Sequence, residues 1–551
     1  MSEPPADYWQ YRHTAAHGDF LRSRDLLLDL RDDHEAASAL FRWPRPEFFN
    51  WALEWFDVIA RDNDRPALQL LQDGGAGETL SFAQLSAESD RTANWLLAAG
   101  VRRGDHVMVV LAQQRELWEV LLACLKIGAV VVPTYTSLTA AEAADRLRRG
   151  RIRHVICRDD LTHLITGPVS GLRAAVPGST EGWSSYRDRL SHEPRFLPQA
   201  PTGADDVAFC YFTSGTTSAP KLVAHTHSSY PIGHLSSLYW NGLRPGDRHL
   251  NISAPGWAKH SWSSLFVPWN AEATIVATPP GPLDPGTLPG LLKDHGVTSV
   301  CAPASTWQAV RPHLGAARPA LREATSAGEP LTEQIVEEVA AAWGVTLRDG
   351  YGQSEATAMI GTSPGLPRRP GRLGRVLPGY RIVLRAPDGS PGPGQGEICV
   401  DLEGGRPAGL MAGYLDESGT LKPASAEGIY RTGDLATCDA GGYFRILGRT
   451  DDVFKSFDHR ISPYELEAVL KSHPAVAEAA VIPRPHRVGG FTPHAVVELV
   501  PGRHADDVSA EALLHHCSDR LAPELCPRSV EFTPRLPRTT SGKVRRSALS
   551  G

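Results

Sequence analysis

The stretch YFTSGTTSAPK, from Tyr211 to Lys221, has the residue types of a loop that binds phosphate. Five serine and threonine residues surround one glycine, and the stretch ends on a lysine. Backbone N–H groups at a glycine turn form a nest for anions, the hydroxyl groups add donors, and Lys221 adds a positive charge. The spacing differs from the G-x-x-x-x-G-K-[ST] loop of other nucleotide-binding proteins. Read alone, the stretch also fits a surface turn rich in serine and threonine.

The stretch DGYGQSE, from Asp349 to Glu355, offers a flat aromatic ring and a carboxylate. Two glycines flank Tyr351, so the backbone can approach a flat ligand on which the ring stacks. Glu355 is a candidate ligand for a Mg²⁺ ion shared with phosphates, because this ion prefers few carboxylates together with phosphate oxygens. A glycine-rich turn without a ligand explains the stretch equally well.

Three further stretches follow toward the C-terminus. In YRTGDL, residues 430–435, a carboxylate after a glycine turn can accept two ribose hydroxyl groups. GRTDD, residues 448–452, stands where the glycine- and proline-rich short strands give way to the last α+β block. In PRTTSGKVRR, residues 537–546, Lys543 is the one lysine and the other basic residues are arginines. The alternative for this last stretch is a solvated basic tail.

Lysine is rare in this chain, and its positions are therefore informative. It occurs only at Lys126, Lys221, Lys259, Lys293, Lys422, Lys455, Lys471 and Lys543. Every other basic residue apart from histidine is arginine. A retained lysine indicates a role that needs a compact point charge.

The elements between these stretches must position them. From Thr79 onward short apolar strands alternate with helices, as in HVMVVL, RELWEVLLACLKIG and AVVVP, and again in TIVATPP, LPGLLKDHG and VTSVCAP. This alternation predicts an α/β fold with parallel sheets covered by helices. Residues 1–60 are expected to form amphipathic helices, and a β subdomain is expected after Gly371. We predict an N-terminal domain over residues 1–450 and a small α+β domain over residues 451–551.

The composition excludes several classes of protein. The chain has 551 residues, 42% of them hydrophobic, and a net charge of −6, which predicts two or more globular domains and no nucleic-acid partner. The N-terminus lacks the pattern of a secretory signal. The most apolar stretch, residues 121–133, is too short to span a bilayer and contains Lys126. Eight cysteines without metal-binding spacing predict reduced thiols and a cytoplasmic protein.

In their order and spacing, the five stretches resemble those of the adenylate-forming superfamily: acyl-CoA synthetases, adenylation domains of peptide synthetases and firefly-type luciferases. The resemblance runs from about Phe48 to Arg546. PGWAKHSWSSLFVPWNAEATIV, residues 255–276, and FNWALEWFD look most like medium-chain and aryl acyl-CoA synthetases. The resemblance implies a large N-terminal domain that binds ATP and the acyl group, and a small mobile C-terminal domain that rotates about a hinge at Asp451.

Such enzymes activate a carboxylic acid with ATP. The carboxylate attacks the α-phosphorus, pyrophosphate leaves, and an acyl-adenylate remains bound; positioning and electrostatic stabilisation dominate catalysis. The resemblance implies that the phosphates of ATP are bound by a loop of Ser214, Gly215, Thr216, Thr217 and Lys221, and that Mg²⁺ is bound by Glu355 and Thr217. It implies that adenine lies on a shelf of Gly328, Glu329 and Pro330, with further nucleotide contacts from Asp349, Gly350, Tyr351, Gly352, Gln353 and Ser354. Asp434 and Arg449 would contact the ribose, and Lys543 would bridge the substrate carboxylate and the α-phosphate. Trp257 and His260 are expected beside the acyl carboxylate, with core packing as the alternative for both.

The turn after the hinge departs from the family pattern. Relatives read K-x-x-G-x-R-I-x-P-x-E where this chain has KSFDHRISPYE, so Asp458 stands at a glycine that lets the pantetheine of CoA pass the backbone. The CoA tunnel is expected to include Lys455, Phe457, Asp458, His459 and Arg460. A carboxylate beside an apolar ligand is unfavourable. We therefore predict intact adenylation with weak or absent transfer to CoA. The alternative is a shifted loop that leaves the tunnel open in a complete acyl-CoA ligase.

Two other classes remain open from the sequence. One is a non-catalytic homologue that binds nucleotide or acyl ligands, and the other is an adenylating oxidase of the luciferase kind. The expected cofactors are ATP and Mg²⁺, with CoA depending on the turn at Asp458. The expected substrate is a carboxylic acid, and our hypothesis is a bulky aryl, alicyclic or terpenoid acid from secondary metabolism. If transfer to CoA is lost, the expected partner is a separate thioester-forming enzyme or a carrier protein.

Overall fold

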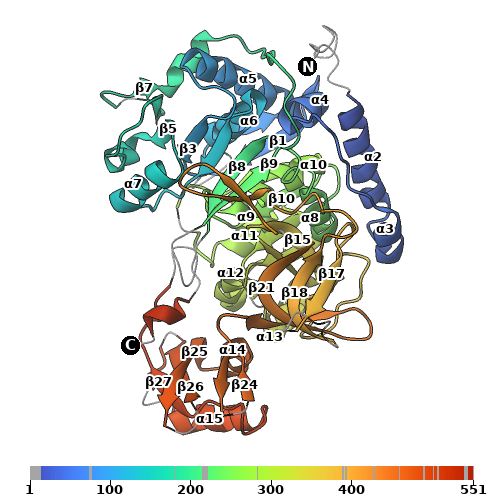
Figure 1. Cartoon of the computed structure of the whole chain (residues 1–551), viewed down its shortest axis with the longest axis vertical. Helices are drawn as coiled ribbons and strands as arrows, with labels where there is room; N and C mark the ends of the chain where they lie inside the picture. The colour runs from blue at the N-terminus through green and yellow to red at the C-terminus, as the bar shows by residue number, and fades with distance from the viewer. Residues whose placement is uncertain are drawn as a thin grey trace.

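The structure is a computed structural model of the whole chain (Figure 1). It describes residues 14–72, 77–178, 180–213, 221–281, 283–329, 331–386, 390, 392, 394–425, 428–457, 459–487, 490–500, 502–504, 508–538 and 544–549, apart from the side chains of Arg460 and Ser547. The predicted α/β class is confirmed, because two large, mainly parallel sheets with helices form the N-terminal part and a smaller α+β part follows at the C-terminus.

The first large sheet has nine strands, and its six central strands are parallel. Their order is β16 (Arg375–Val376), β15 (Ala356–Gly361), β14 (Leu347–Gln353), β13 (Glu323–Ala327), β12 (Ser299–Ala302), β10 (Arg248–Asn251), β11 (Thr274–Ala277), β1 (Pro66–Leu70) and β2 (Thr79–Ser81). Adjacent parallel strands end at the same edge of a sheet, where ligands bind in open α/β folds. The residues that follow β13 and form the end of β14 are therefore neighbours in space.

The second large sheet also has nine strands, with antiparallel pairs at one end and parallel pairs at the other. Their order is β20 (Leu421–Pro423), β19 (Gly413–Leu415), β9 (Leu222–Thr226), β8 (Val207–Phe212), β4 (Val130–Pro133), β3 (His106–Val110), β5 (His154–Arg158), β6 (Arg173–Val176) and β7 (Ser184–Ser185). Strand β19 joins this sheet from a distant part of the chain by pairing with β9. That pairing brings residues near Tyr414 beside the predicted phosphate loop.

The largest core cluster joins strands of both sheets to helices α5 (Phe82–Ala98), α6 (Arg115–Ile127), α8 (His234–Asn241) and α10 (Val267–Asn270). Helix α6 is buried from Leu117 to Ile127, and its two buried charges are paired, Glu119 with Arg115 and Lys126 with Asp57 and Asp90. The prediction of amphipathic helices is wrong for the segment around Trp51 and Trp55, because residues 51–57 are all buried, Glu54 and Asp57 included. Trp51 donates to Asn270 Oδ1 at 2.7 Å, so even its polar atom is paired inside the core.

Local sequence signals explain where several helices begin and end. Ser81 and Gln84 form a capping box at the start of α5, and Thr139 and Glu142 form another at the start of α7 (Ala140–Arg149). Gly128 ends α6 in the left-handed conformation, with φ of 79°. These signals lie within a few residues of the helix ends, and the one at Gly128 ends α6 at the end of the predicted stretch RELWEVLLACLKIG.

A four-stranded antiparallel sheet follows the two large sheets, as predicted for the region after Gly371. It consists of β17 (Ile382–Arg385), β18 (Gln395–Asp401), β21 (Ile429–Cys438) and β22 (Phe444–Arg449). The last two strands are in register with Asp434 opposite Arg449. Two motifs separated in the sequence therefore share one edge of this sheet.

The C-terminal part has its own sheet and its own core (lower part of Figure 1). It contains β23 (Phe454–Ser456), β24 (His459–Ile461), β25 (Val476–His486), β26 (Gly490–Leu499) and β27 (Ser529–Phe532), with helices α14 (Pro463–Lys471) and α15 (Ala510–Ser518). The Arg445 guanidinium of β22 pairs with Glu465 of α14 at 3.5 Å. The domain boundary at residues 450 and 451 stays a prediction.

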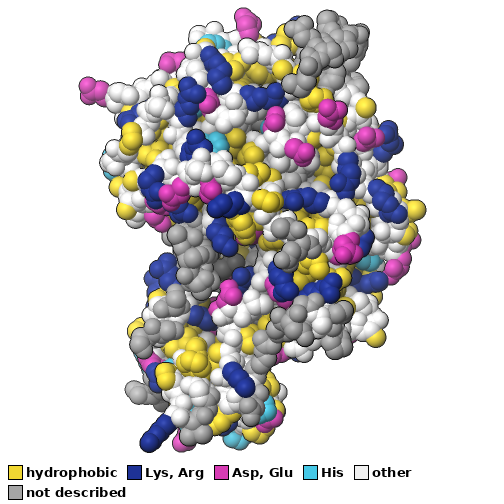
Figure 2. Space-filling model, viewed as in Figure 1, with side chains coloured by type: hydrophobic (Ala, Val, Ile, Leu, Met, Phe, Trp, Pro, Cys, Tyr) yellow, Lys and Arg dark blue, Asp and Glu magenta, His cyan; other side chains and the backbone are white. Residues whose placement is uncertain are grey.

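The surface carries mixed charge. Figure 2 shows lysine and arginine side chains interspersed with acidic ones over the face in view, without one large field of a single sign. In the part of the chain that the structure describes, no helix has both the length and the apolar character needed to cross a bilayer.

Candidate active site

The carboxyl edge of the first sheet brings two predicted motifs together. Ser326 and Asp349 are register partners on β13 and β14, as are Ala327 and Gly350. Gly328 and Glu329 follow β13 directly, and Glu329 Oε2 accepts a hydrogen bond from the backbone N–H of Ser305 at 2.8 Å. The predicted adenine shelf therefore lies beside the DGYGQSE stretch, with Pro330 outside the described residues.

A cluster of polar side chains joins this edge to the four-stranded sheet. The Tyr351 hydroxyl and the Gln353 amide each donate to Asp434 Oδ2 at 2.5 Å, and Arg449 Nη1 lies 3.3 Å from Asp434 Oδ1. Burial and the Asp434 carboxylate raise the pKa of Tyr351 well above its usual value. Burial opposes the charge on Arg449, but contact with Asp434 outweighs it and raises the pKa of the guanidinium. Tyr351 therefore donates as a neutral phenol, and Arg449 stays charged.

Glu355 and Lys221 both contact Tyr414, Glu355 at its hydroxyl group and Lys221 over its ring. The Tyr414 hydroxyl donates to Glu355 Oε1 at 3.0 Å, and the Lys221 ammonium lies 4.8 Å from the centre of the Tyr414 ring. The backbone of Ser354 is held by His225 Nε2 at 2.7 Å. A carboxylate and an ammonium at this spacing suit a phosphate chain with its cation.

The predicted phosphate loop begins and ends on a β-hairpin. Strands β8 and β9 pair with Phe212 opposite Leu222, and the Thr213 backbone N–H donates to the Lys221 carbonyl at 2.9 Å. The loop is thus closed at its base, next to Glu355. Ser214, Gly215, Thr216 and Thr217 lie outside the described residues, so their roles remain predictions.

The predicted acyl-site residues lie at helix α9 (Ala258–Ser261), with Trp257 directly before it and His260 within it. The Trp257 ring stacks on Tyr135 with centroids 5.1 Å apart, and this side chain is half-buried. His260 is 2% exposed, and burial lowers its pKa to about 3. A neutral imidazole in the core matches the packing alternative at least as well as a catalytic role, which remains a prediction.

Lys259 was not among the predicted site residues, yet it lies at the same edge. Its ammonium donates to the Ala327 carbonyl at 3.3 Å, directly before the predicted adenine shelf. The rarity of lysine in the chain was the signal that could have identified it.

The C-terminal residues of the prediction fall around a short hairpin. Strands β23 and β24 pair with Ser456 opposite His459, so two residues of the sequence separate these partners. Phe457 has φ of 52° and is 45% exposed, and its ring lies 5.3 Å from His486. Lys455 and His459 are exposed, and Asp458 lies outside the described residues.

The predicted hinge and the segment after Lys543 are tied to each other. Arg546 donates to Asp452 Oδ2 at 2.7 Å and to both oxygens of Glu467 at 2.9 and 2.6 Å. Asp451 lies 3.8 Å from the Arg449 guanidinium. Lys543 is outside the described residues, but the chain on both sides of it is anchored, because Arg538 and Val544 form a β-bridge.

Packing against Trp240 accounts for one of the two glycines that flank Tyr351, and the approach of a ligand to its backbone stays a prediction. A Cβ on Gly350 would lie 2.3 Å from Trp240 Cε2, so packing of α8 against β14 excludes a side chain there. The glycine is thus required by the core, and approach of a ligand is not needed to explain it.

We predict that Gly350→Ala lowers the free energy of unfolding by about 1–3 kcal/mol, because the new methyl group overpacks the Trp240 contact. Chemical denaturation of the variant measures this loss. Gly290→Ala is the matched control, since a Cβ on that glycine of α11 (Leu288–Asp294) meets nothing within 4 Å. Equal stability of the Gly350 variant and the wild type would contradict the packing explanation.

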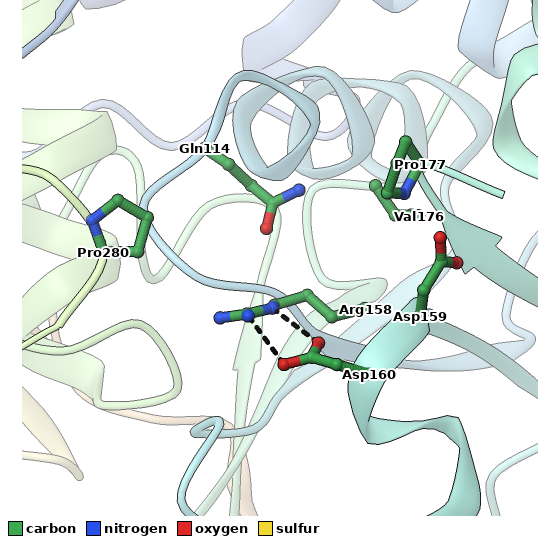
Figure 3. Close-up of a pocket in the computed structure, with 7 residues that line it drawn as sticks. All are labelled: Gln114, Arg158, Asp159, Asp160, Val176, Pro177 and Pro280. Carbon is green, nitrogen blue, oxygen red and sulfur yellow. Dashed lines mark hydrogen bonds and ion pairs between the residues drawn. The ribbon is translucent and has the colours of Figure 1, made fainter. Parts of the chain in front are cut away.

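A separate hollow lies away from these residues (Figure 3). Its lining is Gln114, Arg158, Asp159, Asp160, Val176, Pro177 and Pro280. Arg158 donates to both oxygens of Asp160 at 2.9 and 2.7 Å, and Asp159 accepts from the Gly178 backbone at 3.2 Å. These charged side chains are already hydrogen-bonded within the protein, and none of the predicted site residues lines this hollow.

Comparison with known proteins agrees with the geometry. The family model for AMP-binding enzymes matches residues 55–415, and the model for the C-terminal domain of AMP-binding enzymes matches residues 465–543. The chain is 38% identical over 514 residues to 4-hydroxybutyrate–CoA ligase 1 of Metallosphaera sedula, covering 91% of this chain and 90% of that protein. It is 31% identical over 537 residues to the human mitochondrial acyl-coenzyme A synthetase ACSM3, covering 94% and 92%.

Solved structures give the same result. The anthranilate CoA ligase AuaEII in complex with anthranoyl-AMP superimposes with a TM-score of 0.78 at 26% identity, covering 93% of this chain and 98% of that one. An acyl-CoA synthetase of Brucella canis superimposes with a TM-score of 0.72 at 26% identity, covering 94% and 98%. The chain belongs to the AMP-binding enzyme family, and it is an adenylating enzyme of the adenylate-forming superfamily that includes the medium-chain acyl-CoA synthetases.

Proposed function

We propose that this enzyme converts a carboxylic acid and ATP into an acyl-adenylate and pyrophosphate. The observation that carries the proposal is the cluster of Asp434, Arg449, Tyr351 and Gln353 beside Glu329 at the carboxyl edge of the sheet. Asp434 offers carboxylate oxygens to ribose hydroxyl groups, and the adjacent backbone edge suits a flat adenine ring.

The phosphates of ATP would lie toward Lys221 and Glu355. One Glu355 oxygen accepts the Tyr414 hydroxyl, and a carboxylate has further lone pairs for a cation. A bound Mg²⁺ ion would neutralise charge on the phosphates. Lys221 adds a positive charge over the ring of the same Tyr414, so it would stabilise the developing charge on pyrophosphate together with the cation.

The second half-reaction would transfer the acyl group to CoA: the thiol sulfur attacks the acyl carbon and AMP leaves. The relatives named as CoA ligases support a complete ligase. Asp458 supports a second candidate, in which adenylation proceeds and transfer to CoA is slow. The register of Ser456 with His459 supports another reason for this aspartate, because short connections between paired strands favour Gly, Asn and Asp.

The acid remains a proposal at the level of class. The names of the relatives point to a short hydroxylated aliphatic acid or an aryl acid. If transfer to CoA is slow, a separate thioester-forming enzyme or a carrier protein would consume the adenylate. Eight unpaired cysteines support a cytoplasmic location for the reaction.

The test is incubation with ATP, Mg²⁺ and a panel of carboxylic acids, with and without CoA, followed by mass spectrometry of the products. Acyl-CoA formed at the rate of pyrophosphate release identifies a complete ligase. Acyl-AMP that accumulates in the presence of CoA identifies a disabled second step. A protein that releases no pyrophosphate with any acid would be a non-catalytic homologue, and oxygen uptake would indicate the oxidase class.

For the slow-transfer candidate, we predict that Asp458→Gly raises the rate of acyl-CoA formation by roughly 10-fold or more, because it removes a charged group from beside an apolar ligand. The rate of pyrophosphate release without CoA should stay unchanged. Asp458→Asn is the matched variant, since it keeps the bulk and removes the charge. If neither variant gains ligation, the obstruction hypothesis is wrong.

A further inference from the structure

Lys259 is an enclosed lysine without a carboxylate partner among the described residues. Its one hydrogen bond is to the Ala327 carbonyl at 3.3 Å, and no described carboxylate lies within ion-pair distance. An ammonium group has three N–H donors, so one carbonyl leaves donor capacity unused. The side chain is half-buried, yet burial still lowers the pKa of the group, which indicates protein around most of it.

Lys126 is an example of a lysine in this chain whose charge is neutralised by carboxylates. Its ammonium is fully buried and lies 2.8 Å from Asp57 and 2.6 Å from Asp90. The two lysines thus differ in their partners: the fully buried Lys126 has two carboxylates, and the half-buried Lys259 has none within ion-pair distance among the described residues. A buried charge normally requires a partner, because unpaired burial is unfavourable.

The nearest acidic groups do not replace such a partner. Glu329 and Asp349 interact with Lys259 through space, but Glu329 is held by the Ser305 backbone and Asp349 by the Gly350 backbone at 2.9 Å. Burial raises the pKa of Asp349 to about 7, so this carboxyl group is only partly charged at neutral pH. The positive charge of Lys259 is therefore weakly compensated in the free enzyme.

The position of Lys259 connects it to the acyl substrate. It lies two residues after Trp257, whose ring stacks on Tyr135 at the end of the other large sheet. It contacts Ala327 at the carboxyl end of β13, where ligands bind in this class of fold. Ser326, next to Ala327, is fully buried, and its hydroxyl has no hydrogen-bond partner among the described residues. Lys259 thus stands between the predicted acyl-site aromatic residue and the predicted adenine shelf.

We infer that the acyl site accepts a carboxylic acid with a second oxygen-bearing group, and that Lys259 binds this group, an anionic one more strongly than a hydroxyl. This inference rests on the proposed adenylation and specifies its substrate class. A charge-assisted hydrogen bond in an enclosed site stabilises binding of an acid whose second group can accept from the ammonium. A purely apolar acyl chain leaves the ammonium without this partner. Lys259 is thus a specificity-determining residue.

The test compares acids of equal carbon number: butyrate, 4-hydroxybutyrate and succinate, then hexanoate, 6-hydroxyhexanoate and adipate, then 4-methylbenzoate, 4-(hydroxymethyl)benzoate and terephthalate. The readout is kcat/KM for pyrophosphate release. In at least one series, the wild type should prefer the acid with the distal carboxylate over the unsubstituted acid. In Lys259→Met this preference should fall by roughly 10- to 100-fold, the value of a hydrogen bond to a charged group.

Three variants make the result specific. Lys259→Arg should keep part of the preference because it keeps the charge, and Lys293→Met, at an exposed lysine of α11, should behave as wild type. Lys259→Gln replaces the methionine variant if that one does not fold, as judged by circular dichroism. If the Lys259 substitution slows all acids alike, or leaves every preference unchanged, the inference is overturned while adenylation stands. If the wild type releases no pyrophosphate with any acid, the proposed function fails and the inference falls with it.

Discussion

Replacing Lys543 by alanine is expected to lower acid-dependent exchange of pyrophosphate with ATP by roughly 10²- to 10³-fold, the effect of removing one preorganised charge from a developing oxyanion. The resemblance assigns this lysine to the bridge between the carboxylate and the α-phosphate. The chain on both sides of it is held independently, by the Arg538–Val544 bridge and by a hydrogen bond from the Arg545 backbone to the Pro537 carbonyl at 2.8 Å. Loss of the side chain should therefore leave these anchors intact.

The matched control is Lys471→Ala. Lys471 belongs to the same C-terminal part and pairs with Glu478 at 3.1 Å, so its loss removes a lysine without touching the expected chemistry. The Lys543 variant should still form acyl-CoA from supplied acyl-adenylate and CoA, if the enzyme carries out that step. Unchanged exchange in the Lys543 variant would remove this lysine from the adenylation step.

Asp434→Ala is expected to lower kcat/KM for ATP by roughly 10- to 100-fold, since charged hydrogen bonds to two ribose hydroxyl groups are lost. The main change should be in KM for ATP, because the ribose contacts do not change during the reaction. The substitution also removes the acceptor of Tyr351 and Gln353 and the partner of Arg449. Steady-state kinetics with varied ATP measures the effect.

Two variants separate binding of ribose from support of the cluster. Tyr351→Phe removes only one donor to Asp434, so its effect on KM should be smaller than that of Asp434→Ala. Asp401→Ala removes a carboxylate of the same sheet that pairs with Arg381 at the surface, and it should leave ATP kinetics unchanged. A Tyr351→Phe effect as large as that of Asp434→Ala would assign the loss to the cluster rather than to ribose.

The helices and strands were largely predictable because their signals are local. The helix over RELWEVLLACLKIG and the strands over HVMVVL and AVVVP appear as α6, β3 and β4. Capping boxes and a C-terminal glycine act within one turn of a helix, so no tertiary information is needed to find them. The segment around Trp51 was misjudged because burial on all sides depends on which sheets pack against it.

The sequence by itself determined the α/β class, the order of the motifs and the family to which they belong, because apolar period, turn residues and motif spacing are properties of consecutive residues. Only the tertiary structure decided that Tyr351 and Gln353 meet Asp434 more than 80 residues away, and that Gly350 is required by Trp240. It also separated Lys126, which two carboxylates neutralise, from Lys259, which has none within ion-pair distance in the described part of the chain. Contacts of this kind depend on how distant elements pack, and no local pattern of residues specifies that packing.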